Sequence, residues 1–378
     1  MNLIFHPLAL LPLVDVAAQY QSLDDELDRV VLEVLAKGKY VLGQEMEEFE
    51  QAFSQYTGAR YCITSSSGTS ALHLALQASG VGPGDEVIVP AMSFIATAWP
   101  ISYLGATPIF AEVEWNSACI DPEKIEPLIT PRTKAIVIVH LYGRVASIDA
   151  ILDIAKKYNL TVIEDCCQAH GARFHGQHVG TFGHVGCFSF YPGKNLGTCG
   201  EGGIVITNDA EIAVRCRRMR DHGQTRRYYH YQLGYNYRMP TLMAAVLCTK
   251  LRYLDHWNNC RKQLVRRYHQ ALSNLPLWLP PLVSDESHVW HLYTVRTPRR
   301  TELALWLNHR GVAAGQHYPL PLHLQPAFRH LGYKPGDFPI AERIARETLS
   351  LPLFPEMTER QQLEVIKAVH GFFGGIYD

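Results

Sequence analysis

Two spacings of apolar residues alternate along the middle of the chain. Between residues 61 and 207, short unbroken apolar runs are separated by stretches in which apolar residues recur every three or four positions. Short runs are typical of strands buried on both faces, and the wider spacing is typical of helices with one buried face. Strands are predicted at Glu86–Pro90, 108–113, 134–140, 160–164, 185–190 and Gly203–Thr207, and helices at 69–78, 96–104 and 147–158. This alternation predicts an α/β fold with a mostly parallel central sheet and helices on both faces.

The chain before residue 61 has helical spacing instead. Leu27 and Val34 share one face of a helix that we expect Ser22 to cap and Gly38 to end, and a second helix surrounds Phe49. The apolar segment 3–14 lacks the basic start and the small-residue cleavage site of a signal peptide. We expect that segment to run extended against the body of the protein.

The pattern changes again after residue 208. It indicates a basic helix at 211–221, a segment rich in Tyr, His and Arg at 224–237, long helices over 240–275, a strand at 289–296, and helices at 301–310, 340–349 and 358–373. Mixed helices and a strand predict a smaller α+β domain. We place the large domain at residues 1–255 and the small C-terminal domain at residues 256–378, with the boundary in or at the end of a long helix.

Composition excludes several classes of protein. The formal net charge of −1 gives no basic excess for nucleic acid, and no stretch reaches the roughly 20 apolar residues of a membrane span. The nine cysteines are an odd number without C-x-x-C spacing, which favours reduced thiols in a cytoplasmic protein. The histidines form no H-E-x-x-H motif and no Cys/His quartet, so we expect no metal.

Lys194 is the most informative residue of the chain. It follows the apolar run 185–190 and precedes the glycine-rich segment 197–203, whose glycines favour close backbone packing. A lone lysine is usually a solvated surface residue. Between a buried strand and such a segment, however, desolvation would lower the pKa of its amine and make it a nucleophile.

An acid and a helix start accompany this lysine. Asp165 ends the run 160–164, where α/β sheets bind ligands, and Glu164 should face the other way because strand side chains alternate. Gly68, at the start of the helix at 69–78, precedes two hydroxyl residues that would bind an anion or simply cap the helix. A lysine, a strand-end carboxylate and an anion-binding helix start together suit pyridoxal phosphate.

Other residues extend this candidate site. Gln168 would donate to a ring oxygen of the cofactor or bond to backbone, and Phe94 would stack on the ring or pack in the core. His317, Tyr318 and His323 form a polar cluster that would face a substrate or stabilise a single turn.

Taken together, these motifs resemble the DegT/DnrJ-type sugar aminotransferases, which are fold-type I pyridoxal phosphate enzymes. The likeness covers nearly the whole chain, and two motifs carry most of it. They are Glu164-Asp165-x-x-Gln168-Ala-His-Gly and Phe188-Ser-Phe-Tyr-Pro-x-Lys194-Asn-Leu.

The resemblance implies a role for each matching position. Lys194 would form the imine with the cofactor, Asp165 would pair with its pyridine nitrogen, and Gln168 would contact its ring oxygen. The phosphate and ring contacts implied are Gly68, Thr69, Ser70, Ser189 and Phe94, and the substrate contacts are Tyr191, Arg238, His317, Tyr318 and His323. Residues 234–239 resemble a loop that reaches a neighbouring subunit, where Asn236 touches the phosphate, which implies a homodimer with shared sites.

We therefore predict an aminotransferase that moves an amino group from an amino acid, by resemblance glutamate, to a nucleotide-linked keto-hexose. The segment 317–323 is more similar to members that aminate carbon 3 of the sugar than to those acting at carbon 4. The cluster 226–230 would bind the nucleotide diphosphate or line a dimer interface. The alternatives are a dehydratase, which Lys194 argues against, a cyclitol aminotransferase, and a DegT-like regulatory protein without turnover.

Overall fold

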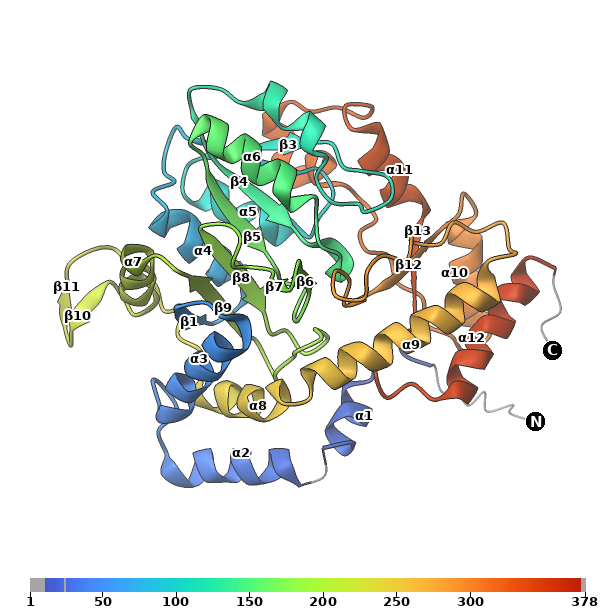
Figure 1. The fold of residues 1–378 in the computed structure, drawn as a ribbon, viewed down its shortest axis with the longest axis horizontal. Helices are drawn as coiled ribbons and strands as arrows, with labels where there is room; N and C mark the ends of the chain where they lie inside the picture. Colours follow the sequence, from blue (N-terminus) through green and yellow to red (C-terminus); the bar gives the residue numbers. More distant parts are fainter. Residues whose placement is uncertain (1–10, 24, 375–378) are drawn as a thin grey trace, which may run out of the picture.

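The computed structural model describes residues 11–23 and 25–374 (Figure 1). A seven-stranded sheet forms its centre, in the order β1-β9-β8-β5-β4-β2-β3. The strands are β1 (Tyr61–Ser65), β2 (Glu86–Pro90), β3 (Thr107–Ala111), β4 (Thr133–Val139), β5 (Thr161–Asp165), β8 (Val185–Ser189) and β9 (Gly203–Thr207). Only β9 runs antiparallel to its neighbours in this sheet, so the predicted mostly parallel sheet is confirmed.

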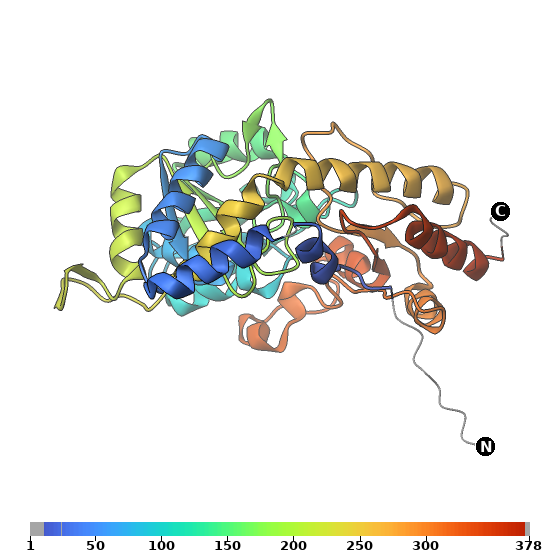
Figure 2. The same cartoon turned by 90° about the horizontal axis from the view of Figure 1, so that it is seen from below.

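Helices cover both faces of the sheet (Figures 1 and 2). They are α3 (Gln44–Thr57), α4 (Gly68–Ala78), α5 (Trp99–Tyr103), α6 (Ile148–Tyr158) and α7 (Ala210–Arg220). Helix α8 (Thr241–Leu251) packs on α3, and α2 (Glu26–Lys37) packs on α8. Strand β8 shows how the faces differ: Phe188 packs edge-on against Phe53 of α3, whereas Ser189 touches the start of α4. Successive residues of this strand thus point to opposite faces of the sheet, one into the core beneath α3 and the next toward the start of α4.

The C-terminal part has its own hydrophobic core, which includes Tyr268, Tyr293 and Leu349. Its elements are α9 (Leu254–Leu272), β12 (Tyr293–Arg296), α10 (Arg300–His309), α11 (Pro339–Glu347), β13 (Thr348–Leu351) and α12 (Glu359–Phe372), with β12 and β13 antiparallel. Leu11 joins this core and pairs with Val312. The division at residue 255 remains a proposal, and it falls in the first turn of α9.

Short elements complete the chain. They are α1 (Val16–Gln21), the paired strands β6 (Arg173–Phe174) and β7 (Gln177–His178), the hairpin β10 (Gln224–Arg226) and β11 (Tyr229–His230), and 3-10 turns at Ile95–Thr97, Pro122–Lys124, Glu126–Leu128, Leu141–Gly143, Leu322–Leu324 and Pro326–Leu331. The hairpin β10–β11 projects from the body in both ribbon views.

Four local predictions are wrong, one of them the end of the helix expected at 340–349, because α11 ends at Glu347 and the strand β13 follows. Ser22 is the C-cap of α1, where its N–H donates to the Ala18 carbonyl, and Asp25 occupies the N-cap position of α2 instead. The strand β1 was not predicted, and the strand expected at 289–296 begins only at residue 293. Gly38 does end α2, in the left-handed conformation that glycine favours. The expected extended segment at 3–14 lies mostly outside the described residues, and only its residues 11–14 can be placed.

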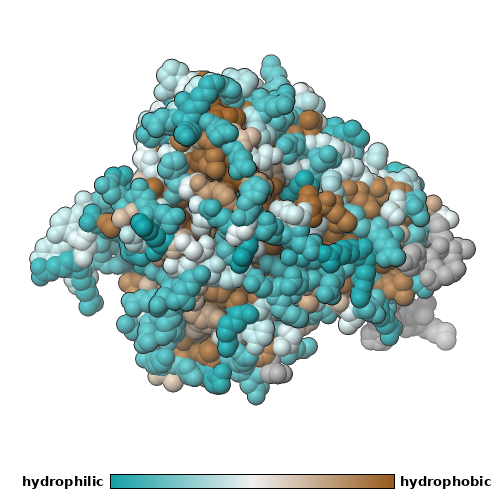
Figure 3. Space-filling view, viewed as in Figure 1, coloured by the Kyte–Doolittle hydropathy of each residue, from teal (hydrophilic) through white to brown (hydrophobic). Residues whose placement is uncertain are grey.

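The surface and the cysteines agree with the composition. The face in Figure 3 is mostly hydrophilic, with hydrophobic residues in separate patches. None of the described helices combines the length and the apolar character needed to cross a bilayer. All nine cysteines are free thiols, as predicted.

Candidate active site

A cavity of about 830 Å³ opens where the parallel strands β4, β5 and β8 end. Their last residues, Val139, Asp165 and Ser189, all line it. Ligands of parallel sheets bind at this edge, because loops there leave backbone and side chains available. The cavity brings together ten of the predicted site residues: Gly68, Thr69, Phe94, Asp165, Gln168, Ser189, Tyr191, Lys194, His317 and Tyr318.

Asp165 presents a buried carboxylate to this cavity. The residue is 5% exposed, and it accepts hydrogen bonds from the Thr97 hydroxyl at 2.8 Å and from the Cys167 N–H at 3.1 Å. Within the described part of the chain no cation pairs with it. A buried carboxylate without a counter-charge is costly, and a positively charged group in the cavity would remove that cost.

Lys194 presents the complementary group. Its amine has no hydrogen bond or ion pair among the described residues, although it lines the same cavity. Burial lowers the pKa of Lys194, and nearby Cys167 and Asp165 oppose that shift. An amine with a lowered pKa is a better nucleophile and base at neutral pH.

The start of α4 is the candidate anion site. Ser67 caps this helix, and its own backbone N–H donates to the Ser70 hydroxyl at 2.8 Å. Ser70 is therefore occupied by the cap and does not line the cavity, whereas Ser67, Gly68 and Thr69 do. Helix N–H groups and hydroxyls at one point favour a phosphate.

Gly68 allows this helix start to approach β8. A Cβ atom at residue 68 would lie 2.6 Å from the Cβ of Ser189 and 3.0 Å from the sulfur of Cys167. We expect Gly68→Ala to push α4 and Ser189 apart and to weaken cofactor affinity about tenfold or more, measured by titrating the apo-protein. Gly82→Ala is the matched control, since a Cβ there meets nothing within 4 Å. Equal affinity in both variants would contradict this role.

Two side chains have orientations fixed by their neighbours. Gln168 accepts the Tyr142 N–H through Oε1 at 2.7 Å, so its amide N–H groups donate, one of them to the Tyr318 hydroxyl at 3.0 Å. Phe94 is 49% exposed and lies 5.6 Å from the Tyr318 ring, so it is not a core residue. Both side chains are thus available to a flat ligand.

Besides Ser70, three predicted site residues lie outside the cavity: Asn236, Arg238 and His323. Arg238 pairs with Asp221 at 2.6 Å and donates to Asn236 at 2.8 Å, in the segment that follows the hairpin β10–β11. His323 is buried and lies 3.2 Å from Glu342. Sequence reasoning missed Thr97, Tyr142 and His291, which hold or line the site, because their spacing to the motifs carries no signal.

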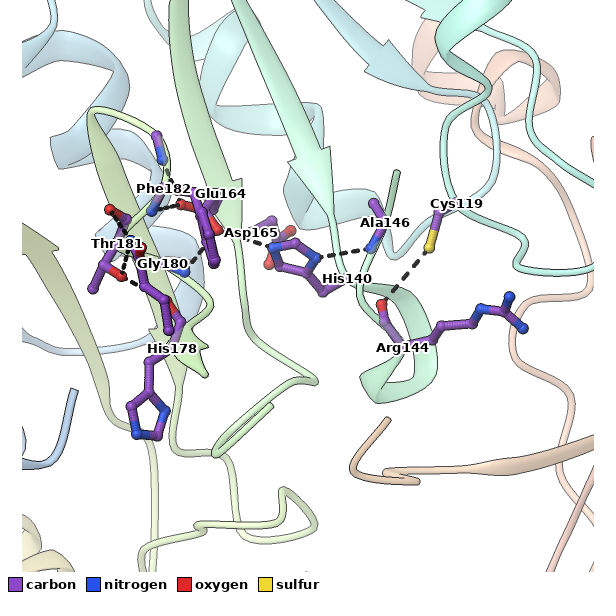
Figure 4. A network of polar contacts seen from close by, with 12 residues as sticks. Cys119, His140, Arg144, Ala146, Glu164, Asp165, His178, Gly180, Thr181 and Phe182 are labelled. Atoms are coloured by element: carbon purple, nitrogen blue, oxygen red, sulfur yellow. Dashed lines mark hydrogen bonds and ion pairs between the residues drawn. The ribbon is translucent and has the colours of Figure 1, made fainter. Parts of the chain in front are cut away.

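Glu164 faces away from the cavity and holds the fold together (Figure 4). Its carboxylate accepts the N–H groups of Gly180, Phe182 and Gly183 at 2.7–2.9 Å. His140 lies 3.1 Å away; its Nδ1 accepts the Ala146 N–H, so its Nε2 carries a proton for Glu164. His140, Glu164 and Cys166 are close enough to hold a metal ion. The imidazole and the carboxylate, however, are already hydrogen-bonded to each other and to backbone N–H groups.

We expect Glu164→Gln to destabilise the protein by about 3 kcal/mol, because an amide N–H would then face backbone N–H groups. Denaturant unfolding measures the loss. The exposed Glu211→Gln serves as control and should change the free energy of unfolding by less than about 0.5 kcal/mol. A chelator should leave the wild-type curve unchanged; a large chelator effect would favour a metal instead.

The sheet order and the lysine–carboxylate cavity define a fold-type I aminotransferase. The chain belongs to the DegT/DnrJ/EryC1/StrS aminotransferase family, which it matches over residues 21–370. The predicted family, fold class and enzyme class are therefore confirmed.

Several relatives are similar over almost their full length. The chain is 44% identical to a dTDP-3-amino-3,4,6-trideoxy-alpha-D-glucose transaminase of Streptomyces venezuelae, with 95% of each chain covered. It is also 44% identical to a pleiotropic regulatory protein of Geobacillus stearothermophilus, with 96% of this chain and 98% of that protein covered. The crystal structure of S. venezuelae DesV in complex with a ketimine intermediate has a TM-score of 0.94 and 43% identity, covering 98% of this chain and 100% of that one.

Proposed function

We propose that this protein is a pyridoxal phosphate-dependent aminotransferase that transfers an amino group from glutamate to a nucleotide-linked keto-hexose. The proposal rests on one observation: two ionisable groups that lack a partner of opposite charge line the same cavity. Among the residues that the structure describes, Asp165 is a buried carboxylate without a cation, and Lys194 is an amine without an anion. A cofactor with a basic ring nitrogen and an aldehyde satisfies both.

The described residues fit this cofactor. Asp165 would face the ring nitrogen, Phe94 a ring face, and Ser67, Gly68, Thr69 and Ser189 the phosphate. When bound, the protonated ring serves as an electron sink for a carbanion next to nitrogen. The solved DesV structure with its ketimine intermediate supports this cofactor, which matches the sequence prediction.

The protein's own groups move and hold the protons. Nζ of Lys194 acts as the base that removes the proton from the α-carbon of the amino donor, because its lowered pKa leaves part of it unprotonated. The Thr97 hydroxyl donates to the Asp165 carboxylate and so holds it in place, where it would stabilise positive charge on the ring nitrogen. The exposed Tyr191 and the ring of His317 line the cavity toward the substrate.

Carbon 3 is the proposed site of amination. The name of the similar S. venezuelae transaminase places the amino group at position 3, which agrees with the sequence of 317–323. We also propose a homodimer, in which Asn236 completes the partner's phosphate site. Tyr228, Tyr231 and Leu233 support this idea, because they expose 75%, 69% and 86% of their surface on the projecting hairpin and the segment after it. The cytoplasmic location remains a prediction.

A panel of nucleotide keto-sugars tests the function. Purified protein with glutamate should aminate a 3-keto sugar and release 2-oxoglutarate, and the position of the new amine is read by NMR. A dehydrated sugar would select a dehydratase, and turnover of an added keto-cyclitol without turnover of the sugars would select a cyclitol aminotransferase. The name of the Geobacillus relative favours a second candidate, a regulatory protein. Glutamate would then leave the colour of the bound cofactor unchanged.

A further inference from the structure

Asn236 lies in a short segment that is fixed to the end of α7. The N–H groups of Tyr235 and Tyr237 donate to carbonyls in the last turn of that helix, at 2.7 and 3.0 Å. Both tyrosine side chains contact His73 of α4. Because side chains alternate along an extended segment, Asn236 points the other way, and it is exposed. The fold thus presents one amide at a fixed place on the surface.

Arg238 fixes the orientation of this amide. Its guanidinium donates to Oδ1 of Asn236 at 2.8 Å and to Oδ1 of Asp221 at 2.6 Å. The other oxygen of Asp221 accepts from Gln224 at 2.6 Å, which holds the carboxylate in place. A guanidinium only donates, so the oxygen of Asn236 faces Arg238 and its two N–H groups face away. Arg238 is therefore occupied within its own chain and does not line the cavity.

The amide N–H groups of Asn236 have no acceptor in the described part of the chain. They lie beside a positively charged guanidinium, which favours a negatively charged acceptor. The cavity of the same chain does not include Asn236. Tyr231 and Leu233 are exposed just before it, and such a surface suits a second copy of the chain. An anion held by that second copy is thus the acceptor that the geometry favours.

We propose that Arg238 is a positioning residue, which holds the amide of Asn236 so that its N–H groups donate to the cofactor phosphate in the partner subunit. This role rests on the proposed function and its homodimer. Arg238 acts through Asn236 and touches neither cofactor nor substrate. It therefore differs from the substrate contact that the sequence resemblance implied. Asp221 shares the role, because it holds the guanidinium.

Two ligands of the apo-protein test whether the role concerns the phosphate. Arg238→Met should weaken the affinity for pyridoxal phosphate about tenfold, and it should leave the affinity for pyridoxal, which lacks the phosphate, within about twofold. Adding Arg238→Met to Asn236→Ala should cause no further loss, because the arginine acts through the amide. Arg267→Met is the matched control, since Arg267 has an exposed ion pair with Glu359 of the same 2.6 Å length. It should bind both ligands like the wild type.

Mixed dimers test whether the role crosses the subunit boundary. Arg238→Met chains are combined with an excess of Lys194→Ala chains, which are inactive by themselves. In a mixed dimer the site that keeps Lys194 receives Asn236 from the chain that keeps Arg238. At a free cofactor concentration equal to the wild-type Kd, activity per Arg238→Met chain should therefore rise about fivefold. A residue that served its own chain's site would give no rise.

Three results would overturn the proposed role of Arg238. They are an equal loss of affinity for pyridoxal and pyridoxal phosphate, a further loss when Arg238→Met is added to Asn236→Ala, and no rise of activity in the mixed dimers. Failure of the proposed function is seen separately, because the wild-type apo-protein would then form an imine with neither ligand. A failure of the homodimer is also distinct, because the protein would sediment as a monomer.

Discussion

Lys194→Ala is expected to lower kcat by about 10⁴-fold or more while the protein stays folded. The variant removes the base that moves the proton and the nucleophile that bonds to the cofactor. It also removes a buried amine whose pKa is lowered, so the apo-protein should lose no stability at neutral pH. Steady-state transamination and denaturant unfolding of the same samples measure both effects.

The pH dependence of stability has a defined sign. Because the folded-state pKa of Lys194 lies below the unfolded value, the unfolded chain binds more protons between the two values. Apo-protein stability should therefore rise with pH across that window in the wild type, and this rise should be weaker in Lys194→Ala. Normal turnover in the variant would contradict the assignment of Lys194.

A second buried lysine provides the matched control. Lys250 lies 5.7 Å from the Trp257 ring, and burial lowers the pKa of Lys250 to about 8, but it does not line the cavity. Lys250→Met should keep transamination within about threefold of wild type. A comparable loss in both variants would mean that burying a lysine, and not its place in the cavity, explains the effect.

Asp165→Asn should lower kcat by about 10³-fold, which corresponds to about 4 kcal/mol of transition-state stabilisation. An amide keeps the size of the side chain, and its single oxygen can still accept from one of the two present donors, Thr97 or the Cys167 N–H, but it cannot stabilise a protonated ring nitrogen. The absorption spectrum and affinity of the bound cofactor should change together with kcat. Wild-type turnover in Asp165→Asn would contradict the proposal that Asp165 stabilises the protonated ring nitrogen of the cofactor.

Thr97→Val separates the charge of Asp165 from its orientation. The change deletes the hydroxyl that donates to Asp165 at 2.8 Å and keeps the branched shape of the side chain. We expect a loss of about tenfold in kcat, much smaller than for Asp165→Asn, because one hydrogen bond to a charged group is lost. A loss equal to that of Asp165→Asn would mean that Thr97 itself contacts the reacting groups.

Strands with continuous apolar runs could be predicted from the sequence, and so could the motif residues at their ends. Strand β1 was missed because its five residues end in Thr64 and Ser65 and so lack an unbroken apolar run. Ser22 was assigned to the wrong helix because the caps of α1 and α2 lie close together and both offer polar side chains. The missed strand leaves the predicted sheet without the edge strand that pairs with β9, whereas the error at Ser22 leaves the sheet unchanged.

The supporting residues of the site could not be predicted, because they are distant in sequence. Thr97 and Asp165 are separated by 68 positions, and Asn195 and His291 by 96. No periodicity links such pairs; only the folded sheet brings them together. The same holds for Ser70, whose hydroxyl residue type suits a phosphate contact but whose position in the cap gives it another partner.

Glu164 and Asp165 are consecutive in β5, yet one carboxylate stabilises the fold and the other faces the cavity. A substitution at one of these two neighbouring positions should therefore affect either catalysis or stability, and not both. Inactive variants at Asp165 should stay folded. Their crystals should therefore bind a soaked sugar nucleotide without converting it.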